Sequence, residues 1–347
     1  MNKRQQEILK FIYVEKLVSA SSIHEHIINL FHESIARITI IRDLDFLLKN
    51  EFIKKQGLAR NVKYCSISSN PLLEYFNVTD YFKNDCDDRS IKNRTFCFDI
   101  FDHLHDLFSV KELLEMEQIN EKFRYNLKKL SPVMLKKEFE RLTIEFSWKS
   151  SHIEGNTYSL LDTEHLIKEN IEAEGHSKEE AIMILNHKRV FDYIFQNAPY
   201  YQEITLAKIE DLHRMLTVNL GIFSGLRSSP VGIVGTNYKP LGNKHQINDA
   251  MCKLIDVVKA TKAPFEKAFI MTLMISHIQP FEDGNKRTSR ILANAILLAH
   301  NYCPLSYRSV NEVEYKKAII LFYEQNSAVC FKKIFVEQFK QALEKYF

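Results

Sequence analysis

Residues 280–290 read Pro280-Phe281-Glu282-Asp283-Gly284-Asn285-Lys286-Arg287-Thr288-Ser289-Arg290. Before them, residues 268–278 carry apolar side chains at helical spacing, and Pro280 ends that helix because the residue before a proline is pushed out of the α region. A second helix is expected from near Gly284 to about His300, where the helical spacing of apolar residues resumes. The segment therefore predicts a helix, a short loop and a second helix.

The start of the second helix is a natural site for an anion. Free backbone N–H groups and the positive end of the helix dipole lie there, at Gly284, Asn285, Lys286 and Arg287. Arg287 and Arg290 lie on one face, where their guanidinium groups can bind phosphate oxygens bidentately. Asp283 offers a carboxylate suited to Mg²⁺, which takes one or two carboxylates plus substrate phosphates. Asp283 could instead simply cap the helix, but the combination in this order predicts a triphosphate site.

The order of these residues resembles the motif of the Fic family, H-P-F-x-[D/E]-G-N-G-R-x-x-R. The matching positions are Pro280, Phe281, Asp283, Gly284, Asn285, Arg287 and Arg290. The resemblance implies that Asp283 holds Mg²⁺ and that Asn285 and the loop amides hold the α- and β-phosphates of ATP. It also implies that Arg287 lies on the β-phosphate side and that Phe281 anchors the loop in the core. The family transfers AMP from ATP, or occasionally another phosphate-containing group, to a protein, so the implied partner is a protein with a Ser, Thr or Tyr hydroxyl.

Two positions depart from the motif. The family's general base is the histidine before the proline, and this chain has Gln279 there. Glutamine can accept a hydrogen bond but has no pKa near 7, and loss of a general base typically slows a reaction about 10²–10⁴-fold. His277 lies about 200° around the helix from Gln279 and is expected to face away. Lys286 replaces a glycine of the motif; Doc toxin kinases resemble the chain here, with N-K-R, but keep the histidine and have alanine at the position of Gly284.

A second segment, Ser150-Ser151-His152-Ile153-Glu154-Gly155-Asn156, resembles the inhibitory-helix pattern of the family, [S/T]-x-x-x-E-[G/N]. The preceding apolar stripe predicts a helix, which Gly155 can end. The resemblance implies that Glu154 pairs with Arg290 and occupies the γ-phosphate position, so that ATP is held in an unproductive pose. A glutamate facing solvent is the alternative for an isolated match, and the presence of both motifs in the expected order favours the inhibitory role.

A third segment predicts a β-hairpin, because Gly225-Leu226-Arg227 is followed by Val231-Gly232-Ile233-Val234-Gly235 and Tyr238-Lys239-Pro240. Fic proteins have a flap at this position that aligns the target segment by strand addition, so the resemblance implies the same role here. A surface loop without a partner is the alternative. The resemblance to the Fic family covers about residues 142–318.

The N-terminal part predicts a winged helix-turn-helix. Apolar spacing predicts helices over residues 3–14, from the caps at residues 19–22 onward, and over about 34–50, followed by strands at 52–55 and 63–67. The third helix is expected to turn these side chains inward: Ile38, Ile41, Leu44, Leu47 and Leu48.

The third helix resembles the recognition helix of the DeoR-like winged-helix repressors, and Asn50-Glu51-Phe52 resembles their turn into the wing. The side chains that would then face the groove or the phosphates are Arg37, Thr39, Ile40 and Lys49. The resemblance implies binding of double-stranded DNA by a homodimer. A winged helix that contacts only proteins is the alternative, since the local excess of basic residues is modest.

Composition sets the broad class. The hydrophobic content of 45% and the charged content of 26% are those of a soluble globular protein. No apolar run reaches the roughly 18 residues of a membrane span, and the N-terminus has no signal-peptide core. The 6 cysteines are scattered without metal-ligand spacing, which favours a reduced environment. We therefore expect a cytoplasmic protein with no membrane partner.

Only 9 glycines and 8 prolines interrupt the chain, and apolar residues recur at helical spacing over most of it. The predicted fold class is mainly α: a Fic helical bundle with a small β-hairpin flap, preceded by a winged-helix domain. The expected domains are a winged helix-turn-helix at 1–69, a helical connector at 70–137 and a Fic domain at 138–347, whose inhibitory helix lies around 138–155.

Three functional interpretations remain open at this point. The first is an active protein adenylyltransferase in which Gln279, His277 or the substrate itself removes the proton. The second is a nucleotide-binding pseudoenzyme whose occupancy the winged helix converts into transcriptional control. The third is a reversed reaction, with Glu154 activating water, or a kinase-like use of ATP. All three keep the same phosphate-binding residues, so these residues do not discriminate among them.

Overall fold

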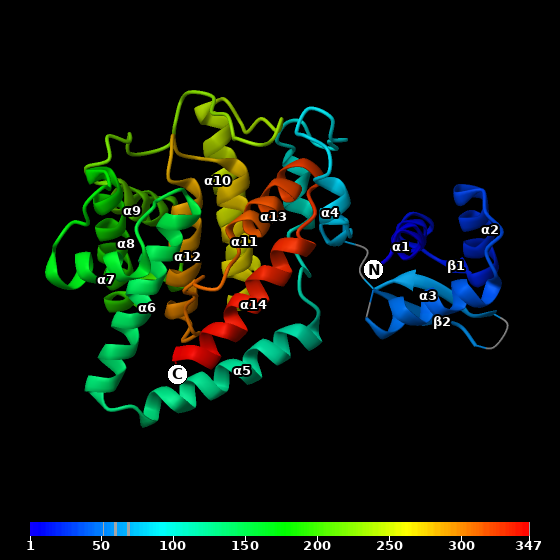
Figure 1. The fold of residues 1–347 in the computed structure, drawn as a ribbon, viewed down its shortest axis with the longest axis horizontal. Helices are drawn as coiled ribbons and strands as arrows, with labels where there is room; N and C mark the ends of the chain where they lie inside the picture. Colours follow the sequence, from blue (N-terminus) through cyan, green and yellow to red (C-terminus); the bar gives the residue numbers. More distant parts are fainter. Residues whose placement is uncertain (51, 59–60, 68–69, 347) are drawn as a thin grey trace. The chain divides into compact units, whose positions relative to one another are not determined.

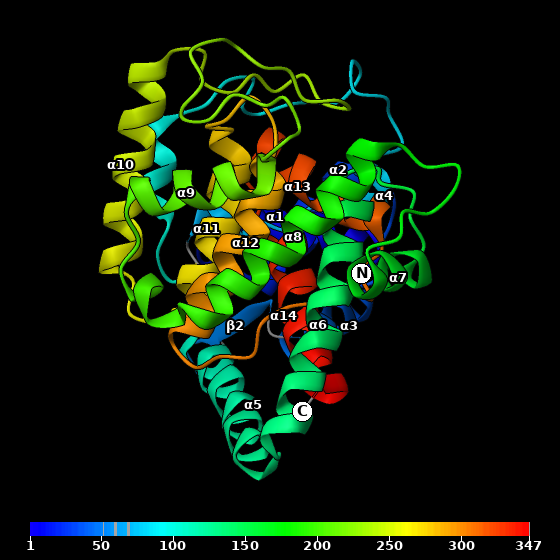
Figure 2. The ribbon, with the colours of Figure 1, turned by 90° about the vertical axis from the view of Figure 1, so that its left-hand side faces the viewer.

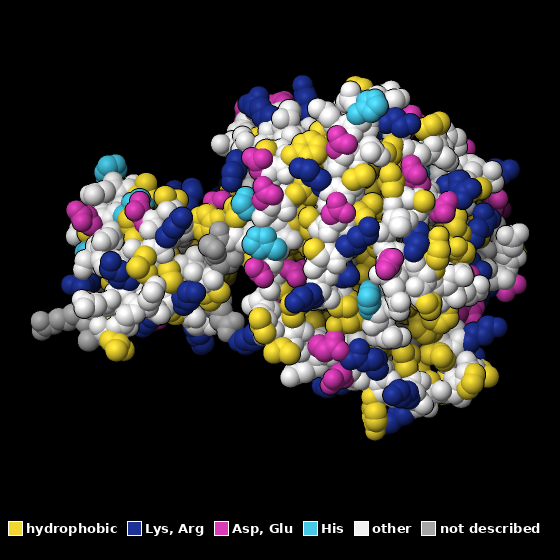
Figure 3. All heavy atoms as spheres, turned by 180° about the vertical axis from the view of Figure 1, so that it is seen from behind, with side chains coloured by type: hydrophobic (Ala, Val, Ile, Leu, Met, Phe, Trp, Pro, Cys, Tyr) yellow, Lys and Arg dark blue, Asp and Glu magenta, His cyan; other side chains and the backbone are white. Residues whose placement is uncertain are grey.

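The computed structural model describes residues 1–50, 52–58, 61–67 and 70–346 (Figure 1). The chain divides into two compact units, the first of residues 1–89 with 326–329 and the second of residues 90–325 with 330–347. None of the described helices is both long and apolar enough to cross a membrane. On the face of the second unit seen in Figure 3, basic and acidic side chains are interspersed, in keeping with the net charge of only +3.

The first unit combines helices with a small sheet. Its helices are α1 (Lys3–Glu15), α2 (Ala20–Phe31), α3 (Arg37–Lys49), the one-turn α4 (Val78–Tyr81) and a 3₁₀ turn, η2 (Pro71–Leu73). Its strands β1 (Val18–Ser19), β2 (Ile53–Gln56) and β3 (Lys63–Ser66) form an antiparallel sheet in the order β1-β3-β2. The expected helices and hairpin are therefore present, whereas DNA binding by this unit stays a prediction. The expected turn and wing include Glu51, Ala59 and Arg60, which lie outside the described residues.

The buried face of α3 differs from the expectation. Ile40, which was expected to face DNA, is fully buried, whereas Ile38 and Ile41 are 55% and 39% exposed. Ile40 shares one face with Leu44 and Leu47 at helical spacing, and it is this face that packs into the core of the first unit. The expectations for Ile38, Ile40 and Ile41 were therefore wrong.

The other side chains expected at the DNA lie differently. Arg37 and Lys49 are exposed, and Thr39 is half-buried. These three positions therefore stay compatible with a contact to phosphates.

The second unit is a bundle of helices. Its elements are η3 (Phe98–His103), α5 (Val110–Lys129), α6 (Pro132–Ile153), α7 (Leu160–Glu169), α8 (Lys178–Gln196), η4 (Ala198–Gln202), α9 (Leu206–Thr217), α10 (Lys244–Ala260), α11 (Pro264–Ile278), α12 (Asn285–Ala299), α13 (Glu312–Gln325) and α14 (Val329–Tyr346). The mainly helical fold class is thereby confirmed.

Helices α11 and α12 form the centre of this bundle. In Figure 1 they lie between α6 and α8 on one side and α13 on the other, and Figure 2 shows them next to each other. Helix α12 contacts α11, α6, α8 and α9. Almost every side chain of α11 is buried, which explains why apolar residues predominate in its sequence. The loop between these two helices is therefore held on a rigid scaffold.

The predicted β-hairpin at residues 225–240 is absent from this described segment, which contains only an isolated parallel bridge between Lys239 and Thr95. Pro230 and Pro240 lack the N–H group that a strand ladder needs, and Gly235 has a φ of 85°. The buried guanidinium of Arg227 instead holds the segment by donating to the carbonyl oxygens of Gln279 (2.6 Å), Ser229 (2.7 Å) and Leu241 (2.5 Å). The hairpin prediction was therefore wrong.

Candidate functional site

The loop between α11 and α12 has the predicted helix–loop–helix form. Gln279 ends α11 in the left-handed region, with a φ of 51° and a ψ of 60°. Gly284 precedes α12 with a φ of 78°, and a Cβ atom there would lie 3.3 Å from Thr217 Cγ2. The backbone conformation therefore favours glycine, and a larger residue would also have to displace Thr217 slightly.

The N-terminus of α12 has no side-chain cap. The first N–H groups of a helix have no partner within it, so those of Asn285, Lys286 and Arg287 are available to an anion. Asp283, the alternative cap, accepts instead from the N–H group of Gly284 at 2.6 Å. The backbone here therefore fits the predicted anion site.

The side chain of Asn285 holds the loop itself. Its Oδ1 accepts from the N–H group of Phe281 at 2.8 Å, and its Nδ2 donates to the carbonyl oxygen of Phe281 at 2.8 Å and to Gln279 Oε1 at 2.9 Å. The Phe281 ring is fully buried and stacks on His213, with 3.8 Å between the ring centroids. Phe281 thus lies in the core, as expected, while the Asn285 amide is engaged with the loop and leaves its backbone N–H for a ligand.

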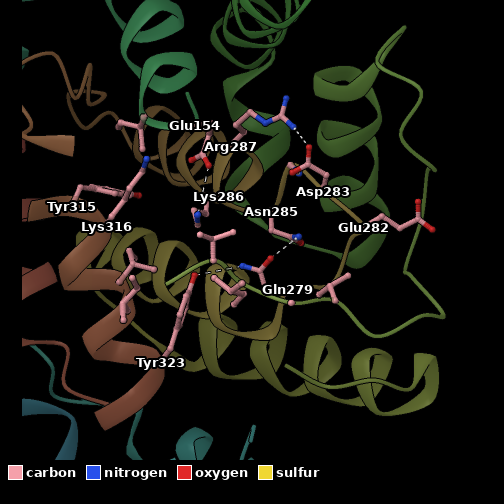
Figure 4. A pocket seen from close by; sticks show the side chains of 18 residues that line it. Glu154, Gln279, Glu282, Asp283, Asn285, Lys286, Arg287, Tyr315, Lys316 and Tyr323 are labelled. Atoms are coloured by element: carbon pink, nitrogen blue, oxygen red, sulfur yellow. Dashed lines mark hydrogen bonds and ion pairs between the residues drawn. The ribbon is translucent and has the colours of Figure 1, made fainter. Parts of the chain in front are cut away.

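A pocket of about 400 Å³ opens in front of this loop (Figure 4). Its walls are the end of α6, residues 231–234, the loop with the start of α12, and one face of α13. The lining residues that lie outside the segments singled out in the sequence are those of α13: Tyr315, Lys316, Ile319, Ile320 and Tyr323. Tyr315, Ile319 and Tyr323 recur at helical spacing, which in a sequence is indistinguishable from an ordinary core face.

Glu154 lies in this pocket between two cationic side chains. Its Oε1 accepts from Arg290 Nη2 at 2.9 Å, and its Oε2 lies 3.7 Å from Lys286 Nζ. Burial by itself raises the pKa of Glu154, but the charges of Arg290 and Lys286 outweigh burial and lower it below its usual value. Glu154 is therefore an ionised internal anion at neutral pH, and the ion pair with Arg290 has the geometry that the resemblance implied.

Arg287 and Asp283 form a second ion pair. Arg287 Nη2 lies 2.9 Å from Asp283 Oδ2; the guanidinium side is only 3% exposed, whereas the carboxylate side is 70% exposed. Among the described residues no group of three potential ligands could hold a metal ion alone. Asp283 fits Mg²⁺ only as one carboxylate that phosphate oxygens and water would complete, which is the arrangement this ion prefers.

Gln279 is not placed to remove a proton. Its Nε2 donates to the carbonyl oxygen of Ser276 at 2.6 Å and lies 3.5 Å from the hydroxyl of Tyr323. His277 does not line the pocket; it is 1% exposed and stacks on Tyr238 with 4.8 Å between centroids. Burial lowers the pKa of His277 to about 3, so the ring stays neutral. The expectation that His277 packs away from the site agrees with this geometry.

The buried histidines make stability depend on pH. The pKa of His277 is lowered by burial from 6.5 to about 3, so between these values the unfolded chain binds a proton that the folded chain does not. The free energy of unfolding should therefore decrease as the pH falls below 6.5. Replacing His277→Phe should reduce this slope by about 1.4 kcal/mol per pH unit between pH 4 and 6.

Urea unfolding at several pH values measures this slope. His245→Gln is the control, because His245 is exposed and the replacement should leave the slope unchanged. An unchanged slope in His277→Phe would show that His277 is protonated in the folded protein.

Comparison with solved structures identifies the fold. Fic-1 (aa134–508) from Caenorhabditis elegans matches with a TM-score of 0.57 and 18% identity, over 68% of this chain and 70% of that chain. A Fic domain containing signaling protein from Bacteroides thetaiotaomicron matches with a TM-score of 0.57 and 22% identity, over 66% of this chain and 94% of that chain. The helical bundle is therefore a Fic fold.

Sequence comparison leads to the same family. Residues 203–297 match the Fic/DOC family, and this segment of the chain is a Fic/DOC family domain. A relative from Aedes aegypti, named protein adenylyltransferase Fic, is 29% identical over 190 residues, which are 52% of this chain and 37% of the relative. One of the same name from Drosophila grimshawi is 27% identical over 168 residues, 46% of this chain and 33% of the relative. The chain thus spans about a third of the length of these curated relatives.

Proposed function

We propose that the Fic unit binds ATP together with Mg²⁺ and that Glu154 blocks the productive pose of the nucleotide. The observation that carries this proposal is the position of the Glu154 carboxylate, which acts as an internal anion in the pocket. The carboxylate of Glu154 lies on Arg290 and Lys286, beside the uncapped start of α12. A pocket that holds one carboxylate among these donors suits the γ-phosphate of ATP once that carboxylate moves away.

We further propose that the unit is a slow protein adenylyltransferase. A Ser, Thr or Tyr hydroxyl of a target protein attacks the α-phosphorus of ATP, the bond to the β-phosphate oxygen breaks, and pyrophosphate leaves. Mg²⁺ at Asp283 would neutralise phosphate charge. Lys286, Arg287 and Arg290 offset the charge of the leaving pyrophosphate. The hydroxyl proton must pass to water or to the substrate, because the Gln279 amide can orient a hydroxyl but cannot take its proton.

A second candidate function is a nucleotide-sensing transcriptional regulator in which the Fic unit is a pseudoenzyme. Gln279 at the base position favours it, as do the exposed Arg37 and Lys49 on α3. In this case a homodimer would bind double-stranded DNA through the first unit, and its affinity for DNA would change when ATP is bound. The two candidates share the nucleotide site and differ in turnover, so binding and transfer must be measured separately.

Removing the charge of Glu154 is expected to raise the affinity for ATP. In Glu154→Gly, Arg290 and Lys286 lose their internal anion and become available to the triphosphate, so titration calorimetry with ATP and Mg²⁺ should give a Kd lower by about tenfold or more than in the unchanged protein. Glu282→Gln is the matched control, because Glu282 is an exposed carboxylate that lines the same pocket away from these cations. Its Kd should stay within about threefold.

Two results would contradict the proposal. The first is the absence of ATP binding in both the unchanged protein and Glu154→Gly. The second is an equal increase in ATP affinity in Glu282→Gln and in Glu154→Gly, which would show only that the pocket repels ATP through its overall charge.

A further inference from the structure

His187 is a buried histidine that lies behind the pocket and not in its wall. It belongs to α8, is fully buried and contacts two serines of α6. Its Nε2 lies 3.0 Å from Ser150 Oγ, and its Nδ1 lies 2.8 Å from the carbonyl oxygen of Met183 and 3.2 Å from Ser151 Oγ. Neither the Fic motif nor the inhibitory-helix pattern includes this residue.

These contacts fix where the protons lie. The carbonyl oxygen of Met183 can only accept, so Nδ1 of His187 carries the hydrogen that it donates. Burial lowers the pKa of His187 to about 3, so the ring is neutral and Nε2 is an acceptor. The Ser150 hydroxyl must therefore donate to Nε2 of His187 and turn its lone pairs elsewhere.

Those lone pairs face Arg290. Arg290 Nε donates to Ser150 Oγ at 3.0 Å, and Arg290 Nη2 donates to the Ser150 carbonyl oxygen at 2.8 Å. The two hydrogen bonds to Ser150 set the plane of the Arg290 guanidinium, which is fully buried. The same Nη2 also donates to Glu154 Oε1. The chain of hydrogen bonds runs in one direction, from Arg290 to Ser150, then to His187, and finally to the carbonyl oxygen of Met183.

We propose that His187 is a positioning residue that, through the Ser150 hydroxyl, fixes the orientation of the Arg290 guanidinium. Without an acceptor at Nε2, the Ser150 hydroxyl is free to turn its hydrogen toward Arg290, where a donor would face a donor. This orientation of the guanidinium allows Arg290 to bind Glu154 in the structure, and it would equally allow Arg290 to bind a terminal phosphate in place of Glu154. Only the statement about phosphate rests on the proposed function.

The test compares three variants. His187→Leu removes the acceptor at similar volume, His187→Gln places an amide that can accept near the position of Nε2, and Ser150→Ala removes the hydroxyl. The first measurement needs no nucleotide: nuclear magnetic resonance gives the tautomer of the His187 ring and the solvent exchange rate of the Arg290 Nε–H, which Arg290→Lys assigns. We expect an Nδ1–H tautomer and exchange at least about tenfold faster in His187→Leu and in Ser150→Ala, with recovery to within about threefold in His187→Gln.

The second measurement compares ATP with AMP in the Glu154→Gly background by calorimetry. His187→Leu should weaken ATP binding by about tenfold and leave AMP binding unchanged, because AMP lacks the γ-phosphate that Arg290 would bind. A purely structural role of His187 would weaken both nucleotides alike or neither.

Several results would overturn the inference. An Nε2–H tautomer in the unchanged protein would do so, and so would unchanged Arg290 Nε–H exchange in folded His187→Leu. If His187→Leu does not fold, the Arg290 Nε–H exchange rate in Ser150→Ala and the His187 tautomer in the unchanged protein still test the inference. If Glu154→Gly itself binds no ATP, the proposed function fails, while the exchange measurement still tests the link between His187 and Arg290.

Discussion

The double variant Glu154→Gly, Gln279→His is expected to transfer labelled AMP to protein about 10²–10⁴ times faster than Glu154→Gly alone. Gln279 lines the pocket at the end of α11, so a histidine there starts from the same backbone position in front of the nucleotide loop. An imidazole with a pKa near 6.5 can take the hydroxyl proton at neutral pH, whereas the amide cannot. Incubation with α-labelled ATP, followed by counting label in the protein and pyrophosphate in solution, measures the rate.

The control for this experiment is Glu154→Gly, Gln279→Asn, which keeps an amide and should match Glu154→Gly. Equal labelling with histidine, glutamine and asparagine at position 279 would show that this side chain does not limit transfer. ATP binding by Glu154→Gly with no label, and with label restored by histidine, would favour the regulator over the slow transferase.

Replacing Arg290→Met should lower the free energy of unfolding by about 3 kcal/mol or more, because it breaks a buried ion pair and leaves one charge behind. Arg290 is fully buried, and its removal leaves Glu154, only 19% exposed, with Lys286 as the remaining cation. The Ser150 hydroxyl and carbonyl also lose their donors. Urea unfolding of the variant and the unchanged protein measures the difference.

A matched control is Arg214→Met. Arg214 pairs with Asp211 on the surface, with side chains 61% and 49% exposed, so its loss should cost at most about 1 kcal/mol. The further change Glu154→Gln in the Arg290→Met protein should recover part of the loss, because it removes the uncompensated charge. A cost for Arg290→Met no larger than that for Arg214→Met would mean that the pair with Glu154 contributes little to stability.

The loop between α11 and α12 was predictable because its determinants are local. A proline that ends one helix, a glycine that needs a left-handed conformation and the apolar spacing on either side all lie within residues 268–300. The Fic domain followed from the motif within the same stretch, and the family match at 203–297 confirms it. The pairing of Glu154 with Arg290 joins segments that are distant in the sequence. It could be predicted only from the resemblance to a family pattern, because no local signal links the two residues.

Features that depend on tertiary packing were missed or misjudged. Tyr315 and Tyr323 reach the pocket because α13 packs against it, and nothing in their own spacing separates a pocket wall from a core. Ile40 and Ile41 are adjacent and equally apolar, so the packing of α3 against the rest of the first unit decides which of them is buried. At residues 225–240, alternating apolar residues suggested strands, but the prolines and the bonds made by Arg227 hold the segment in an irregular form.

The bonds of the Asn285 side chain to both backbone groups of Phe281 have a consequence for the energetics of ligand entry. Because these hydrogen bonds already exist in the folded chain, the conformational entropy of the loop is lost on folding and not on association with a ligand. Binding to such a preorganised loop needs no rearrangement of its backbone, so the association rate of a nucleotide would depend on the movement of the Glu154 side chain and not on a slow loop closure.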